Sequence, residues 1–294
     1  MTMNHVPSKI VLSPELEQFA DSDKISANKG NYREFDWNPD VHEQRALERV
    51  REMLLGINLS HATASEPDSI RRDGILPFDN LVGKCDWRSQ THVLDESLGL
   101  HRYTFFHWGA FHPTQNGRFI FPVDTREVLL SPNTIVTPHY INATMFSYMG
   151  TSTNLLDEGG RERLDGYLDT ILSGSDWVDV IARRSLRYMQ RASSRDSYPI
   201  KNHVDMGEIK HLGAVSPRLI GEPIDIYDEQ AMHPIWRSMI ENDGVTVSYV
   251  TNALNAVERG FSKSDKDKLP HEIGADSKKS RKLWQEILNI AQKS

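Results

Sequence analysis

A histidine and a threonine two residues apart form the first candidate site of this chain. His61, Ala62 and Thr63 end a short strand-like segment, and Ser69-Ile70 and Gly74-Ile75 follow as a predicted short helix and tight turn. At a strand end, the His61 ring can bind a ribose hydroxyl while the main chain of Ala62 faces a carboxamide. The alternative is that His61 forms a hydrogen bond within its own turn.

An aromatic segment supplies a candidate platform for a flat ligand. Residues 100–109 read LHRYTFFHWG, and a strand here places alternate rings on opposite faces of a sheet. One face can pack in the core while a ring on the other face stacks on a planar cationic group. Core packing alone is the competing interpretation.

A glutamate opens the third segment of interest. Glu208 follows Gly207 and begins a strand-like stretch, where the backbone would fix its carboxylate. Such a carboxylate can stabilise a sugar ring that acquires positive charge, and it can orient an acceptor hydroxyl. The same residue could instead be a charge that protects a sheet edge from pairing.

Other groups of polar residues are weaker candidates. His101, His107 and His112 could meet around zinc only with a carboxylate from elsewhere in the chain, so we expect no metal site. Glycine-rich dinucleotide and phosphate loops and the Gly-x-Ser-x-Gly elbow are absent from the sequence, so those site classes lack their anchor. The lysine-rich residues 263–268 and 278–282 are expected to be solvated faces.

Together the three segments resemble the ADP-ribosyltransferase superfamily, most closely its DarT-like branch. The segment around His61 is similar to the first motif of the superfamily, although this chain has Ala62 where His-Gly-Thr is the commoner form. Residues 100–113 resemble the LHDYVPFYF segment of the DarT-like branch. Residues 207–215, with Ile220, are similar to the glutamate-bearing strand of that branch.

The resemblance implies an enzyme that cleaves NAD and transfers ADP-ribose, with NAD as substrate and no metal. Glu208 would be its catalytic residue, His61 would bind the nicotinamide-side ribose, and Tyr103 or Phe106 would stack near the nicotinamide. Arg88 would contact the pyrophosphate or the acceptor, with Arg71 and Arg72 as rivals. The full set of implied NAD-binding residues is His61, Ala62, Thr63, Arg71, Arg88, Tyr103 and Phe106.

The implied acceptor is a macromolecule, expected to be a protein, and the implied biological role is that of a bacterial toxin or effector. Two alternatives stay open. The first is a DNA-directed ADP-ribosyltransferase of the DarT type, and the second is an interaction protein without catalysis whose aromatic strand is simply core. The formal charge of −7 and the pI near 5.9 disfavour a surface built to neutralise phosphates, so nucleic acid is the less expected partner.

The elements that must position these residues follow an α+β order, with a mainly antiparallel sheet. The resemblance narrows this to a split sheet with flanking helices. Hydrophobic periodicity predicts helices over 41–53 and 161–192, the latter divided at Gly174, and one that follows Asp276 or Ser277. Strands are expected over 57–61, 103–108, 118–123, 127–130, 204–215 and 219–226.

Length and composition define the broad class of protein. We expect a polar leader over 1–40, weakly ordered or disordered, a catalytic domain over 41–230, and a helical extension over 231–294 packed on it. The sequence has no apolar run long enough to span a bilayer and no apolar core of a Sec-type signal peptide. A single cysteine, Cys85, excludes an internal disulfide. We therefore expect a soluble protein of the bacterial cytoplasm, or one secreted into a host cell by another route.

Overall fold

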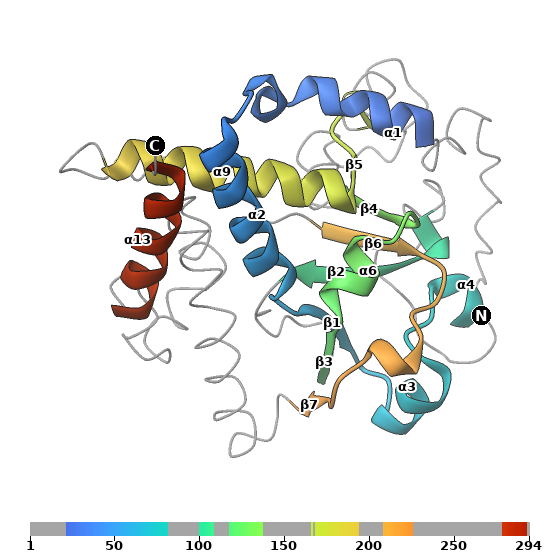
Figure 1. The fold of residues 1–294 in the computed structure, drawn as a ribbon. Coiled ribbons are helices and arrows are strands. Elements are labelled where there is room, and N and C mark those ends of the chain that lie inside the picture. The colour runs from blue at the N-terminus through green and yellow to red at the C-terminus, as the bar shows by residue number, and fades with distance from the viewer. Residues whose placement is uncertain are drawn as a thin grey trace, which may run out of the picture.

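The chain folds into helices and an antiparallel sheet, shown as a ribbon in Figure 1. The computed structural model describes residues 22–81, 100–108, 118–137, 166, 168–193, 208–225 and 278–292. The strands are β1 (Leu59–Thr63), β2 (Tyr103–Trp108), β3 (Phe119–Val123), β4 (Thr134–Thr137), β5 (Leu172–Ser173), β6 (Glu208–Leu212) and β7 (Ile224–Asp225). The α-helices are α1 (Ser22–Asn28), α2 (Val41–Leu55), α3 (Pro67–Asp73), α4 (Phe78–Leu81), α6 (Thr125–Leu129), α9 (Gly174–Ser193) and α13 (Lys278–Gln292). The α+β prediction is therefore confirmed.

The seven strands form one sheet in the order β5-β4-β6-β2-β1-β3-β7, and every neighbouring pair is antiparallel. Because residues directly opposite each other in a ladder share a face, the register divides the side chains into two sets. The core face carries the main hydrophobic cluster, with Leu59, Phe106, Phe121, Val136 and Ile209. The opposite face carries Ser60, Phe105, His107, Thr137, Glu208 and Lys210.

Helices α2 and α9 contribute to the hydrophobic cluster of the core face, and α13 packs against these two helices. The apolar positions of α2 recur at helical spacing, and Ala46, Leu47, Val50 and Leu54 are all fully buried. Ile287 and Leu288 of α13 join the same cluster, and Figure 1 shows α13 beside α2. The indole nitrogen of Trp108 in β2 donates to the carbonyl oxygen of Leu54 at 3.2 Å, so the sheet and α2 are also joined by a hydrogen bond.

Part of the predicted polar leader is folded. Residues 22–40 contain α1 and two 3-10 turns, η2 (Lys29–Asn31) and η3 (Arg33–Asp36). The buried Asn28 amide donates to the carbonyl oxygens of Leu168 at 2.7 Å and Ile171 at 2.9 Å. These hydrogen bonds fix α1 against the turn that precedes β5. Residues 1–21 lie outside the described part.

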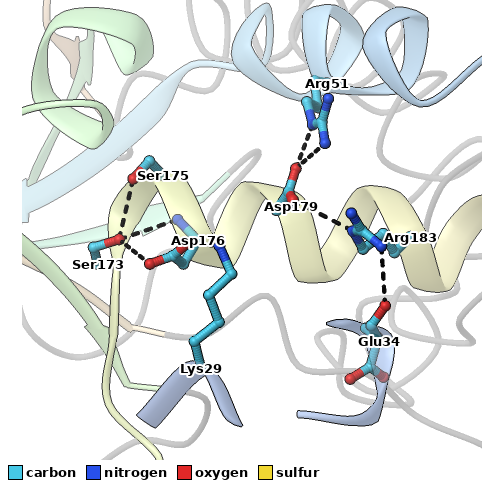
Figure 2. A network of polar contacts seen from close by, with 8 residues as sticks. All are labelled: Lys29, Glu34, Arg51, Ser173, Ser175, Asp176, Asp179 and Arg183. Carbon is cyan, nitrogen blue, oxygen red and sulfur yellow. Dashed lines mark hydrogen bonds and ion pairs between the residues drawn. The ribbon is translucent and has the colours of Figure 1, made fainter. Parts of the chain in front are cut away.

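Ion pairs fasten this N-terminal segment and α2 to α9, as Figure 2 shows. Asp179 of α9 bonds to Arg51 of α2 and to Arg183, 3.3 Å away and one helical turn further along α9. The Arg183 guanidinium also donates to the carbonyl oxygen of Glu34, at 3.2 Å. At the start of α9, Lys29 contacts Asp176 at 2.8 Å. α9 thus binds both α2 and the N-terminal segment, which precede it by more than a hundred residues.

Several expected elements are confirmed and others are wrong. Helix 41–53 is α2 and strand 103–108 is β2, whereas the strand expected over 127–130 belongs to a helix, α6. Asp124 caps that helix because its side chain accepts a hydrogen bond from the Glu127 N–H at 3.0 Å.

Two further boundaries differ from the prediction. Leu172, expected at the end of a helical stripe, begins β5, and of the strand expected over 219–226 only β7 forms after the 3-10 turn η5 (Pro217–Leu219). β4, like β5, was not among the predicted strands. Within the described residues, none of the helices is long and apolar enough to cross a membrane. Residues 231–277 of the predicted helical extension lie outside the described part.

Candidate functional site

The three segments singled out in the sequence lie on neighbouring strands at the centre of the sheet. Glu208 begins β6, the aromatic segment forms β2, and His61 lies in β1, and the sheet order places β2 between the other two. Strands in a sheet are spaced by about 4.8 Å, so β1 and β6 are separated by about 10 Å. The fold therefore brings the main chains of the three predicted motifs together.

The sheet divides between β1 and β2. These strands pair at Leu59–Trp108 and Ser60–His107, whereas β1 pairs with β3 and β2 pairs with β6 along almost their whole lengths. Beyond Ser60, the described residues of β1 and β2 share no further ladder pair. The centre of the sheet is thus marked by the end of ladder pairing between β1 and β2 after Ser60.

The His61 ring occupies the point of division. Its Nδ1 lies 2.8 Å from the main-chain oxygen of Phe105, and its ring centroid is 5.7 Å from that of Phe106. A carbonyl oxygen only accepts hydrogen bonds, so Nδ1 carries the proton and Nε2 of the neutral ring keeps its lone pair. Burial lowers the pKa of His61, which favours this neutral form. The ring can then accept a hydrogen bond from a hydroxyl through Nε2.

On the opposite face, four polar side chains form a row across four strands. Thr137 of β4 is opposite Glu208 of β6, Glu208 is opposite His107 of β2, and His107 is opposite Ser60 of β1. Ser60 and Thr137 are fully buried, and Glu208 is 8% exposed. Cross-strand neighbours have Cβ atoms about 5 Å apart, so adjacent members of this set can interact with each other. We call Ser60, His107, Thr137 and Glu208 the polar row.

A buried lysine neutralises the carboxylate of the polar row. Lys210, two residues after Glu208 and on the same face, places Nζ 2.6 Å from Glu208 Oε2 and 2.6 Å from Thr137 Oγ1. The same nitrogen lies 5.5 Å from the centroid of the Phe105 ring. A charged pair in such a position must be closely bonded, because desolvation of each ion is costly.

His107 is held neutral by its surroundings. Burial is the largest cause that lowers its pKa, to about 3, and the nearby His61 and the Lys210 charge lower it further. At neutral pH the polar row therefore combines one carboxylate with an uncharged imidazole and two hydroxyls. Its partly exposed members, His107 and Glu208, can form hydrogen bonds with sugar hydroxyls, and Glu208 can stabilise a developing positive charge.

The structure separates some of the residues predicted to share one site. His61, Thr63 and Phe106 lie on the core face, whereas Ala62, Tyr103 and Glu208 lie on the opposite face. Tyr103 pairs with Leu212, four residues along β6 from Glu208, which is about 13 Å at the usual rise of a strand. Thr63 Oγ1 accepts from the N–H of Ser65 at 3.1 Å and so closes the turn after β1.

The predicted phosphate ligands lie at the surface or outside the described residues. Arg71 is paired with Asp68 at 3.1 Å and Glu222 at 2.7 Å, and Arg72 is paired with Asp73 at 2.9 Å. Both guanidinium groups are exposed and already hold carboxylates, which a phosphate ligand would have to displace. Arg88 lies outside the described part of the chain.

The three histidines considered as zinc ligands do not form a described cluster. His101 lies in the 3-10 turn η4 (Leu100–Arg102), with Nε2 3.5 Å from Asp79 Oδ1, while His107 lies in the polar row. His112 is outside the described part. Among residues whose placement is described, no three histidine, cysteine or acidic side chains are arranged to hold a metal ion.

Of the polar row, Glu208 alone was predicted from the sequence as a residue of this site. Lys210, which lies beside the row, was not predicted either. Lys210 stands two residues after Glu208, and in a strand this spacing puts two side chains on one face, so their pairing had a signal in the sequence. Thr137 and Ser60 had none, because they reach Glu208 and His107 only through strand register. Along the opposite face of β2, Phe105 lies nearer the carboxylate than Tyr103 does.

Comparison with known proteins adds no assignment to this geometry. The chain matches no protein-family model and no curated protein sequence.

Proposed function

We propose that the protein is a mono-ADP-ribosyltransferase that cleaves NAD and transfers ADP-ribose to a macromolecular acceptor. The observation that carries the proposal is the position of Glu208: an ionisable carboxylate in the polar row, on the strand next to β2 and away from the main hydrophobic core. The resemblance of the His61, aromatic and Glu208 segments to motifs of that superfamily supports it, as does the division of the sheet beside His61.

In this reaction the bond between C1 of the ribose and the nicotinamide nitrogen breaks, and its electron pair leaves with nicotinamide. A nucleophile of the acceptor gives an electron pair to C1 and releases its proton to solvent. Positive charge develops on the ribose as the bond breaks, so a fixed carboxylate stabilises the transition state more than the substrate. Glu208 supplies that carboxylate in our proposal. Nε2 of His61, on the other face of the sheet, accepts a hydrogen bond from a hydroxyl of NAD where the sheet divides.

A protein is the acceptor we propose, because the net charge of −7 opposes binding to the phosphate backbone of nucleic acid. Transfer to a protein is also the chemistry expected of a toxin or effector, which is the biological role that goes with this proposal.

The test uses NAD labelled in its adenylate phosphate, a mixture of cell protein and single-stranded DNA, and release of nicotinamide as a second readout. We expect labelled protein, and Glu208→Gln should lower the rate roughly 10²- to 10³-fold. Glu52→Gln is the matched control, since the Glu52 side chain is 58% exposed and pairs with Arg126 at the surface. Label on DNA would move the acceptor to nucleic acid, and intact NAD with every acceptor would refute the proposal and favour an interaction protein.

A further inference from the structure

The ion pair beside the polar row is not explained by packing. Lys210 is fully buried, and its cross-strand neighbours on the same face are the apolar Ile135 and Phe105. A leucine or methionine at this position could contact both neighbours without desolvation of a charge. Replacement of buried ion pairs by apolar residues of similar volume is often neutral or stabilising. Lys210 compensates the buried Glu208 carboxylate, so it is the Glu208–Lys210 pair as a whole that needs a reason other than stability.

The hydrogen bonds of Lys210 indicate why the ion pair is present. The ammonium donates to Glu208 Oε2 and to Thr137 Oγ1, both at 2.6 Å, and the Thr137 hydroxyl donates in turn to the main-chain oxygen of Glu208 at 3.4 Å. The three groups form a closed set between β4 and β6. One carboxylate oxygen is thus fixed by a cation that is itself anchored on the next strand.

We propose that Lys210 is a positioning residue for Glu208, with Thr137 as its anchor. Lys210 holds Oε2, so that the other oxygen, Oε1, is the one that meets the ribose of NAD. This inference rests on the proposed function, because it assigns Lys210 a role in the same reaction. The ammonium also compensates the carboxylate charge where Glu208 has only 11% of its side chain exposed.

Geometry gives the expected size of the effect. A carboxylate displaced by about 1 Å from its productive position can cost roughly 10²-fold in rate. Lys210→Met keeps the length of the side chain and removes its charge, so we expect kcat for nicotinamide release to fall by roughly that factor while KM for NAD changes less than about threefold. A role limited to folding would lower the amount of active enzyme instead, without a change in the kcat of the folded fraction.

Thr137 supplies the test if Lys210→Met does not fold. Thr137→Val removes the anchoring oxygen at nearly constant volume, and Thr137→Ser keeps it. We expect Thr137→Val to lower kcat and Thr137→Ser to restore it. Lys24→Met is the matched control, because Lys24 of α1 pairs with Asp169 at 3.7 Å and is not part of the polar row.

The experiment separates this inference from the proposed function. Wild type and Glu208→Gln are measured first: wild type that releases no nicotinamide overturns the function and, with it, the role of Lys210. If Glu208→Gln is inactive while folded Lys210→Met has wild-type kcat, the function stands and the positioning role is overturned. If Lys210→Met is unfolded and Thr137→Val has wild-type kcat, the positioning role is overturned as well. A drop in kcat for Lys210→Met, or for Thr137→Val with rescue by serine, supports it.

Discussion

His61 and Phe105 are joined by a hydrogen bond between a ring and the main chain at the point where β1 leaves β2. The ring nitrogen bonds the carbonyl oxygen of Phe105 beyond the last ladder pair of these strands. The bond also fixes which nitrogen of the imidazole carries the proton, so the lone pair of the other nitrogen is available to a hydroxyl. The His61 side chain therefore bonds to β2 and, in our proposal, also binds NAD.

Removal of the His61 ring should weaken NAD binding. In His61→Ala the accepting nitrogen is lost, and loss of one hydrogen bond of about 1.4 kcal/mol raises Kd roughly tenfold. Isothermal titration calorimetry with NAD on folded protein measures the change, and circular dichroism verifies the fold. His42→Ala, on α2, is the control. An unchanged Kd in folded His61→Ala would remove His61 from the binding site.

Stability should fall as pH decreases below about 6.5. His107 has a pKa of about 3 in the folded protein, lowered mainly by burial, whereas a histidine in the unfolded chain has its ordinary value near 6.5. Between these values the unfolded chain binds more protons, so protons favour unfolding, and the stabilisation is fully present only above pH 6.5. From pH 7.5 to 5.5 this one residue contributes a loss of about 1.4 kcal/mol.

Urea unfolding across that pH range measures the loss. The pKa values of His61 and His211 are also lowered by burial, so both act in the same direction. His107→Gln removes one titrating group and should flatten the dependence, while His42→Gln is the control on α2. Parallel curves for wild type and His107→Gln would contradict the assignment.

Gly74 should not tolerate a side chain. Its φ is +81°, and a Cβ atom would lie 2.2 Å from the carbonyl oxygen of Val215, which accepts from the Ile75 N–H at 3.1 Å. We expect Gly74→Ala to lower the free energy of unfolding by roughly 1–3 kcal/mol. Gly30→Ala is the matched control, since a Cβ there meets nothing within 4 Å and should change stability by less than about 0.5 kcal/mol. Equal stability of the two variants in urea would show that the turn can rearrange.

The folded N-terminal segment gives a further prediction. Asn28→Ala leaves the carbonyl oxygens of Leu168 and Ile171 without the amide that they bond, at a cost of about 1–3 kcal/mol. Asn31→Ala removes one exposed hydrogen bond, to the Asp169 carbonyl oxygen at 3.1 Å, and should cost less than about 0.5 kcal/mol. Thermal unfolding of both variants compares the costs, and a larger loss for Asn31→Ala would be the opposite of our expectation.

The sequence predicts elements well where a hydrophobic pattern extends over many residues or where many of the side chains are aromatic. The helix that became α2 has four buried positions at helical spacing and an Asp40 cap, and β2 has alternate rings, so both were predicted close to their observed bounds. The short run 127–130 fits a strand or a helix equally well. Asp124 decided the outcome, because its side chain bonds the first turn of α6.

The sequence predicted the strands that carry the candidate site, but not the face of the sheet on which each side chain lies. Which strands are neighbours, and which residues oppose each other, depends on pairing between segments far apart in the chain, such as Thr137 with Glu208. A shift of one residue would move Glu208 to the core face and Ile209 to the polar row. For this reason the sequence could suggest His61, Tyr103 and Glu208 separately, but not that His61 and Glu208 project from different faces.

The sparse pairing of β1 with β2 divides the sheet into two halves. β5, β4, β6 and β2 form one half and β1, β3 and β7 the other, and among the described residues the ladder pairs Leu59–Trp108 and Ser60–His107 join them. A relative rotation of the halves about these two pairs would change the distance between His61 and Glu208 without breaking a ladder within either half.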